Sequence, residues 1–171
     1  MEQSPAIDTQ LFRRTLSRFA TGVTVITVAH SEHIHAMTAN AFMSVSLHPP
    51  LVLISISHTA QMYKLLAPGS LYGVSMLSDD QEGLSRHFGG RPIHGLEAAF
   101  IQGHGVPLLK GAIAYIVAKV VDTHQTGDHT LFIGEVQYMQ GHHGRPLLFY
   151  AGSYGQVTNE HPIEALGWMG L

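Results

Sequence analysis

Short apolar runs separated by polar turns occupy most of the chain. Residues 23–28 alternate valine and isoleucine with threonine, and this β-branched run predicts a strand. Residues 51–56 form an apolar run of strand length after Pro49-Pro50, and residues 71–77 are also predicted to form a strand. Residues 112–121 and 131–139 are two longer strand candidates joined by a polar connection, which indicates a hairpin.

Three short segments carry helical spacing instead. Asp8 predicts the start of a first helix that Gly22 ends, and Pro68-Gly69 ends a second. Ser78 and Gln81 have the spacing of a capping box, which predicts a third helix that stops at Gly89-Gly90. The apolar residues of these helices are Phe12, Leu16, Phe19, Ala20, Met62, Leu65, Leu66, Leu84 and Phe88.

The order of these elements predicts a mainly β fold. Closely spaced strands with few short helices favour an antiparallel barrel, because a parallel sheet needs a long crossover after most strands. Residues 91–110 are expected to cross irregularly, and residues 147–150 to form a last core strand. The length of 171 residues fits one domain, with its core at about 11–157 and a C-terminal tail at 158–171.

The composition favours a second copy of the chain as a partner and argues against nucleic acid and anionic membranes. The chain is 45% hydrophobic and only 12% charged, so part of its apolar surface is expected to be buried in a homodimer. A net charge of −3 gives no support for binding nucleic acid or an anionic membrane. The sequence has neither a run long enough to span a membrane nor a basic leader at Glu2–Asp8, which predicts a cytoplasmic location.

Two uncharged polar segments are the first candidates for a binding site. In residues 37–46 hydroxyl and amide side chains alternate with small apolar ones, and residues 55–59 read Ser-Ile-Ser-His-Thr. The outward face of an ordinary strand has the same pattern. The presence of two such segments favours the alternative, in which neutral donors share one anionic ligand.

The histidines are less informative. His33 with His35, and His142 with His143, provide at most two ligands each, so no metal site is predicted. His129 lies in Gly-Asp-His-Thr, where it can hydrogen-bond a carboxamide or contact a cofactor ring, or can simply be a solvated turn histidine. No Gly-x-Gly-x-x-Gly or phosphate-loop motif is present, so any nucleotide must be held by another geometry.

Four motifs in order give the chain a family resemblance. They are residues 19–27 (FATGVTVIT), 37–47 (MTANAFMSVSL) with Pro49-Pro50, 127–136 (GDHTLFIGEV) and 146–150 (PLLFY). Together they resemble the short-chain flavin reductase family over nearly the whole chain. The resemblance implies an FMN-binding split β-barrel that acts as a homodimer and serves as the reductase component of two-component flavin-dependent monooxygenases.

The same resemblance implies a set of site residues. The residues expected to line the flavin are Thr38, Ala39, Asn40, Ala41, Phe42, Ser44 and Val45. Ser55, Thr59 and Ala60 are expected near its ribityl and phosphate end, and His87 and Phe88 to close over it. His129 is expected to contact the nicotinamide, with Gly152 and Tyr154 beside it.

The predicted activity is hydride transfer from NADH or NADPH to FMN or FAD, and the residues leave the choice within each pair open. Two alternatives use the same barrel: a non-catalytic flavin or haem carrier, and an oxidase with tightly bound FMN that is similar to pyridoxamine-phosphate oxidase. A cluster of Arg and Lys dedicated to a substrate phosphate would favour the second alternative, and the nine basic residues show no such cluster in the sequence.

Overall fold

The computed structural model describes residues 7–158. The strands are β1 (Thr21–Gly22), β2 (Thr24–His30), β3 (His33–Ala39), β4 (Phe42–Leu47), β5 (Pro50–Ser57), β6 (Leu71–Met76), β7 (Phe100–Gly103), β8 (Val106–Leu109), β9 (Ala114–Thr126), β10 (His129–Gly141), β11 (Leu147–Tyr150) and β12 (Ser153–Gln156). The helices are α1 (Thr9–Leu16), α2 (Gln61–Leu65) and α3 (Glu82–Phe88), and the 3-10 turn η1 (Asp79–Gln81) precedes α3.

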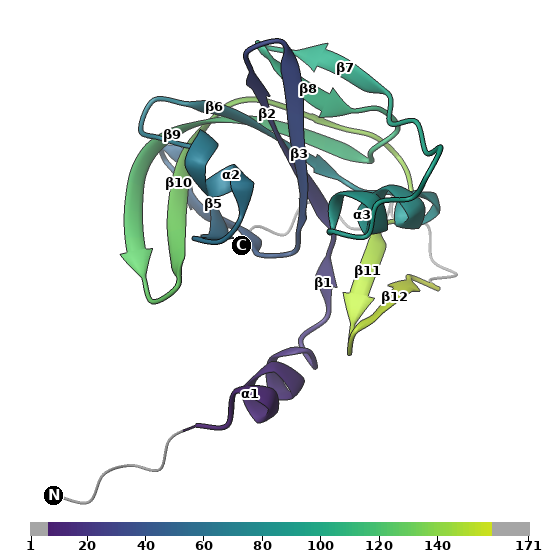
Figure 1. The fold of residues 1–171 in the computed structure, drawn as a ribbon. Helices are drawn as coiled ribbons and strands as arrows, with labels where there is room; N and C mark the ends of the chain where they lie inside the picture. The colour runs from purple at the N-terminus through teal and green to yellow at the C-terminus, as the bar shows by residue number, and fades with distance from the viewer. Residues whose placement is uncertain (1–6, 159–171) are drawn as a thin grey trace, which may run out of the picture.

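A seven-stranded antiparallel sheet forms the barrel, in the order β3-β2-β6-β9-β10-β5-β4 (Figure 1). The edge strands of the sheet are β3 and β4, and Asn40 and Ala41 link the end of β3 directly to the start of β4. The amide of Ser55 on β5 donates to the carbonyl of Ala41 at 3.1 Å, which holds this link against the sheet. The predicted mainly β, antiparallel split barrel with short flanking helices is confirmed.

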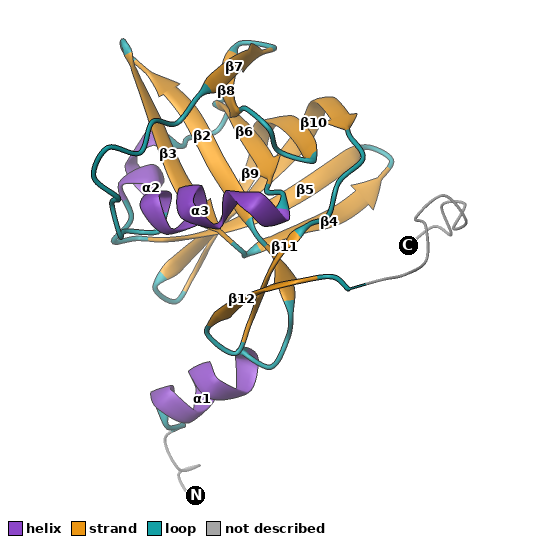
Figure 2. Cartoon of the chain, turned by 90° about the vertical axis from the view of Figure 1, so that its right-hand side faces the viewer, coloured by secondary structure: helices purple, strands orange, loops and turns teal. Residues whose placement is uncertain are grey.

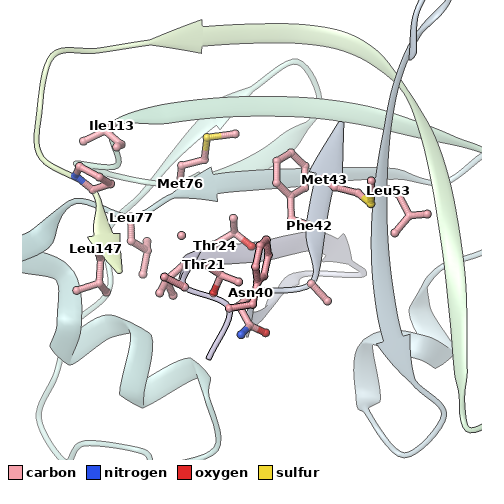
Figure 3. Close-up of a pocket in the computed structure, with 16 residues that line it drawn as sticks. Thr21, Thr24, Asn40, Phe42, Met43, Leu53, Met76, Leu77, Ile113 and Leu147 are labelled. Carbon is pink, nitrogen blue, oxygen red and sulfur yellow. The ribbon is translucent and has the colours of Figure 1, made fainter. Parts of the chain in front are cut away.

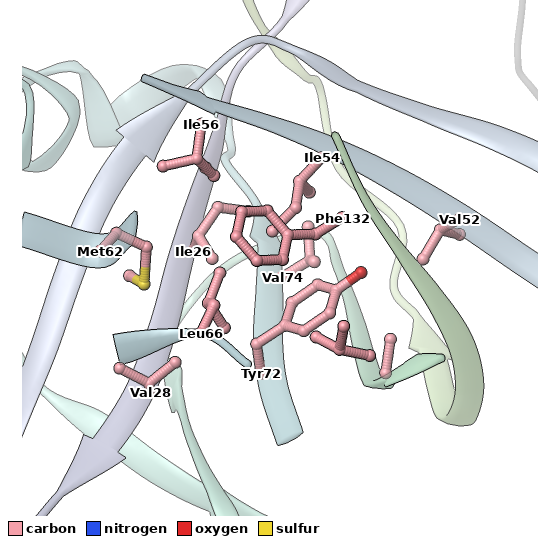
Figure 4. Close-up of a cluster of buried hydrophobic side chains, with 12 residues drawn as sticks. Ile26, Val28, Val52, Ile54, Ile56, Met62, Leu66, Tyr72, Val74 and Phe132 are labelled. Atoms are coloured by element: carbon pink, nitrogen blue, oxygen red, sulfur yellow. The ribbon is translucent and has the colours of Figure 1, made fainter. Parts of the chain in front are cut away.

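Alternation along the strands fills the barrel. On β5 the side chains of Val52, Ile54 and Ile56 are buried, whereas the residues between them are only partly covered. The buried side chains meet those of Tyr72 and Phe132 inside the barrel (Figure 4). Helix α2 lies at one end of the barrel in Figure 1 and adds Met62 to this core cluster.

Helix α1 begins where the sequence predicts and ends earlier. The Asp8 carboxylate accepts from the amide of Gln10 at 2.8 Å, which confirms the predicted cap. The helix ends at Leu16, where Ser17 provides the C-cap, so the prediction that Phe19 and Ala20 continue its apolar face is wrong. Figure 2 shows α1 standing clear of the barrel, and no α1 residue is buried, so no packing extends the helix.

Two β segments differ from the prediction. The span 91–110, predicted to be irregular, contains the β7–β8 hairpin, whose turn uses positive φ at His104 and Gly105. Strand β12, which lacks an alternating pattern, pairs with β11 across the positive-φ pair Ala151 and Gly152. All three strands, β7, β8 and β12, depend on pairing with a neighbour rather than on local propensity. By contrast, the capping box of Ser78 and Gln81 is present as predicted.

The predictions for the two ends of the chain fall largely outside the described residues. The predicted C-terminal tail lies outside the described residues from residue 159 onwards, and so does Glu2. Among the helices of residues 7–158, none is long and apolar enough to cross a membrane.

Candidate functional site

A cavity of about 670 Å³ opens between β1 and the β3–β4 link (Figure 3). Its volume lies within the ~300–1,000 Å³ that small-molecule sites occupy. The wall is mostly apolar, and its large side chains are Phe19, Phe42, Met43, Leu53, Met76, Leu77, Ile113 and Leu147. Apolar walls of this size suit a flat organic ring.

Three polar side chains interrupt that apolar wall. Thr24 Oγ1 already donates to the carbonyl of Ala39 at 2.7 Å. Thr21 Oγ1 is buried and has no hydrogen-bond partner among the described residues, and Thr21 lines this cavity together with Asn40 (Figure 3). Because an unpaired buried hydroxyl is costly, Thr21 marks a point where a bound polar group would be stabilised.

A second cavity of about 240 Å³ continues the first beyond Asn40 and Val23, which line both. Thr38 and Tyr154 face each other across it, tied through one residue of α3. Thr38 Oγ1 donates to the Ser85 carbonyl at 2.7 Å, and the Ser85 hydroxyl lies 2.8 Å from Tyr154 Oη. The fold therefore brings the predicted residues of β3 and β12 together, although more than one hundred residues separate them in the sequence.

The outer face of β5 and β10 leads from the first cavity toward His129. Leu53 lines that cavity, and Ser55 and Ser57 follow on the same side of β5. His129 is the cross-strand partner of Ser57. Strand geometry puts Ser57 ~13 Å from Leu53, so His129 lies at the far end of this outer face and not within the cavity.

His129 is held by its neighbour in the β9–β10 turn. Its Nδ1 lies 2.7 Å from Oδ1 of Asp128. The hydrogen bond and the charge of His129, with a smaller effect of His58, lower the pKa of the exposed Asp128 carboxyl below its ordinary range. The Asp128 carbonyl also accepts from the amide of His58 at 3.0 Å, which docks the turn on the end of β5. The imidazole is thus oriented by a carboxylate while its Nε2 is left for another partner.

The hydroxyl side chains of the second polar segment cluster near His129. Ser57 Oγ and Thr59 Oγ1 lie 2.9 Å apart. Ala60 provides the N-cap of α2 and packs against the core. The region around Ser57 and His129 is therefore rich in neutral donors.

Besides Ser55, Thr59, Ala60 and His129, four further predicted residues line none of the cavities described here. Ser44 and Val45 lie at a bulge of the edge strand β4 and are exposed. Phe88 packs against a core cluster beside Phe100, and His87 Nδ1 accepts from the amide of Ile93 at 3.1 Å. Their contact with the flavin stays a prediction.

The sequence reasoning missed Thr21, Ser85 and two arginines of the site. Arg86 and Arg91 line a third cavity with Tyr154 and Gly152. The five-residue spacing of these arginines across Gly89-Gly90 was the only signal in the sequence. That spacing points to a site only once β12 lies beside α3 and brings Tyr154 next to the two arginines.

The histidines do not gather into a metal site in the described part of the chain. Among residues 7–158, no three His, Asp or Glu side chains lie close enough to share a metal ion. His142, one of the paired candidates, instead packs edge-on against Tyr115 at 5.7 Å.

The first two cavities and the adjoining outer face of β5 and β10 together form a groove lined by neutral donors. The split barrel and this groove define a protein of the FMN-binding split-barrel class. Residues 16–158 match the family described as "Flavin reductase like domain". The chain belongs to this flavin reductase family. It is 45% identical over 156 residues to the "NADH-dependent flavin reductase" of Rhodococcus sp, covering 90% of this chain and 89% of that protein.

Two further comparisons agree with this membership. The "4-hydroxyphenylacetate 3-monooxygenase, reductase component" of Thermus thermophilus is 37% identical over 150 residues, covering 87% of this chain and 97% of that protein. The solved structure "Flavin reductase PheA2 in native state" superimposes with a TM-score of 0.86 at 46% identity, covering 90% of this chain and 100% of that chain.

Proposed function

We propose that this protein is an NADH-dependent flavin reductase that transfers a hydride from the reduced nicotinamide to FMN or FAD. The observation that carries the proposal is the groove itself, in which Thr38, Asn40 and Tyr154 converge beside an apolar cavity. The Rhodococcus relative is named for the same activity and matches nearly the whole length of this chain.

The residues present fit a flavin. The apolar walls of the first cavity can cover the ring system, and the unpaired Thr21 hydroxyl and the Asn40 amide can bond its polar edge. When bound, the flavin supplies the hydride-accepting chemistry. The protein then has to orient and desolvate, so a site without a strong acid or nucleophile is sufficient.

His129 is the residue we assign to the nicotinamide. Asp128 accepts from Nδ1, and the Nε2 atom is then free to bond the carboxamide of the hydride donor. Ser55, Ser57 and Thr59 on the neighbouring strand end provide neutral donors for the flavin beside it. Gly152 and Tyr154, at the other end of the groove, are assigned to the same dinucleotide.

A homodimer completes this proposal. The apolar side chains of α1 and its C-terminal extension are exposed: Leu11 55%, Phe12 51%, Leu16 56% and Phe19 77%. Burial of such surface against a second copy is a strong driving force for association. The Thermus relative is named as a monooxygenase component, so we assign a flavin-dependent monooxygenase as the recipient of the reduced flavin.

Two alternatives on the same barrel are disfavoured. A flavin or haem carrier would not need a hydride donor, and the relatives named above are reductases or reductase components. An oxidase with tightly bound FMN would retain its flavin during purification. The cytoplasmic location and the single domain with a core at 11–157 remain predictions.

One spectrophotometric assay tests the proposal. The purified protein is mixed with each pairing of NADH or NADPH with FMN, FAD or no flavin, and oxidation of the nicotinamide is followed by absorbance. We expect NADH to be oxidised and the rate to depend on added flavin. A protein that binds flavin but oxidises neither nicotinamide would be a carrier, and a yellow protein that needs no added flavin would support the oxidase.

The dimer is tested separately by light scattering after size exclusion. We expect twice the mass of one chain for the wild type and a shift to monomer for Phe12→Asp. The control is Ile101→Asp, which introduces the same charge at an exposed apolar site on β7. A monomeric wild type would contradict the proposal.

A further inference from the structure

A small cavity with two arginines extends the groove beyond Tyr154. It has a volume of about 210 Å³ and lies between the C-terminal end of α3 and the β11–β12 hairpin. Its walls are Arg86, Gly89, Arg91, Phe149, Gly152 and Tyr154, and none of these is acidic. Gly89, Phe149 and Tyr154 also line the second cavity, so the arginines lie directly beside the groove.

The guanidinium of Arg86 is held in place before any ligand arrives. Its Nε and Nη2 donate to Oε1 of Glu82 at 2.8 and 2.7 Å, and its Cζ lies 4.8 Å from the ring centre of Tyr154. These contacts use two of the five N–H donors that an arginine carries. The remaining donors belong to a fork that is already oriented, which lowers the entropic cost of binding an anion.

Arg91 is placed next to Arg86 by the turn that ends α3. Gly90 adopts a φ of +85°, and the amide of Arg91 then donates to the carbonyl of Arg86 at 3.1 Å. The bond from the Ile93 amide to His87 fixes the following residues against the helix. Within residues 7–158 the Arg91 side chain makes no ion pair, so its charge faces the cavity and solvent uncompensated by that part of the chain.

We propose that Arg86 and Arg91 bind the phosphate or pyrophosphate group of a nucleotide that occupies the groove. A pair of guanidinium groups suits an anion with several acceptor oxygens, since each can donate two parallel hydrogen bonds. The hydroxyl-lined part of the groove is uncharged and cannot neutralise such a group. That the ligand is a nucleotide rests on the proposed function, whereas the anion site itself does not.

Titration with inorganic pyrophosphate tests the anion site without any enzyme activity. Isothermal titration calorimetry is run on the wild type, Arg91→Gln, Arg91→Lys and Lys110→Gln, the last an exposed control outside the cavity. We expect Arg91→Gln to weaken binding about tenfold, Arg91→Lys to weaken it less, and Lys110→Gln to leave it unchanged. Equal binding by the wild type and Arg91→Gln, or an equal loss in Lys110→Gln, would overturn the proposal.

A kinetic comparison identifies the molecule that carries the phosphate. NADH is compared with 1-benzyl-1,4-dihydronicotinamide, which has no phosphate, and FMN and FAD are compared with riboflavin. If the nicotinamide nucleotide is the ligand, Arg91→Gln raises KM for NADH and leaves that for the benzyl compound unchanged. If the flavin is the ligand, the variant weakens FMN or FAD and not riboflavin. An equal effect on a phosphate-free compound and its phosphorylated counterpart would overturn the proposal.

The two proposals fail in different ways. Pyrophosphate binding that depends on Arg91, in a protein without reductase activity, leaves the anion site standing and removes the proposed function. Reductase activity combined with pyrophosphate binding that does not depend on Arg91 leaves the proposed function standing and removes the anion site.

Discussion

The Oδ1 atom of Asp128 lies 2.7 Å from Nδ1 of His129, and this pair closes the β9–β10 turn beside the end of β5. The contact matters because the two ring nitrogens of a histidine have different tasks once one is bonded to a carboxylate. Here Nδ1 is bonded to the carboxylate, which leaves Nε2 for the nicotinamide that we assign to this residue.

We predict that His129→Ala raises KM for NADH roughly two- to tenfold, the range expected for the loss of one hydrogen bond to a neutral group. Flavin affinity, measured by fluorescence titration in the absence of NADH, should stay within about twofold. His33→Ala is the matched control, because His33 is exposed at the opposite hairpin of β2 and β3. Unchanged NADH kinetics in His129→Ala would remove this residue from the site.

Asp128→Asn is expected to raise KM for NADH in the same direction and by less than His129→Ala. The amide keeps the shape of the side chain, but it binds the imidazole more weakly than the carboxylate does. Because Asp128 is fully exposed, the melting temperature should change by no more than ~1 °C, as for ordinary surface substitutions. A loss of thermal stability with unaltered KM would mean that the pair is structural only.

Tyr72→Phe should stabilise the protein. The Tyr72 ring lies in the barrel core with no solvent exposure, and its hydroxyl has no hydrogen-bond partner among the described residues. Removing an unpaired buried hydroxyl should raise the free energy of unfolding by about 1 kcal/mol, or the melting temperature by about 2–4 °C. Thermal unfolding followed by circular dichroism measures the difference, and a less stable variant would indicate a hydrogen bond that the structure lacks.

We also predict how the stability difference between Tyr72→Phe and the wild type changes at alkaline pH. Burial raises the pKa of the Tyr72 phenol well above its ordinary value of 10.0. Because the pKa is raised in the folded state, the phenol ionises more easily in the unfolded state. The free energy of unfolding of the wild type is therefore unaffected by this ionisation below pH 10 and falls as the pH rises above 10. The stability advantage of Tyr72→Phe over the wild type should therefore widen between about pH 10 and pH 11. A constant difference over that interval would contradict the assignment.

Gly134→Ala should destabilise the protein through the same side chain. A Cβ at position 134 would overlap the Tyr72 hydroxyl and would lie 2.9 Å from both Tyr72 Cε1 and Ala118 Cβ. Overpacking of this kind costs roughly 1–3 kcal/mol. Gly141→Ala is the control, since nothing lies within 4 Å of its Cβ. The double variant Tyr72→Phe with Gly134→Ala should recover part of the loss, because one of the overlapping atoms is gone.

The long core strands and the caps at Asp8 and Ser78 could be predicted from the sequence because each depends on neighbours in the chain. The β-branched run at 23–28 prefers a pleated backbone wherever it is placed, and Asp8 caps the amide two residues on. The motifs at 37–47 and 127–136 identify the family for a similar reason. Their residue types and order can be read without knowing what they touch.

The tertiary structure alone decided which of these residues share a site. Strand β12 exists because β11 pairs with it, and only that pairing brings Tyr154 to Ser85 and Arg86. Helix α1 ends at Leu16 because no part of the barrel packs on its apolar face. Contacts between residues far apart in sequence depend on how the sheet curls and which strands pair, and neither is encoded in the local pattern of any one segment.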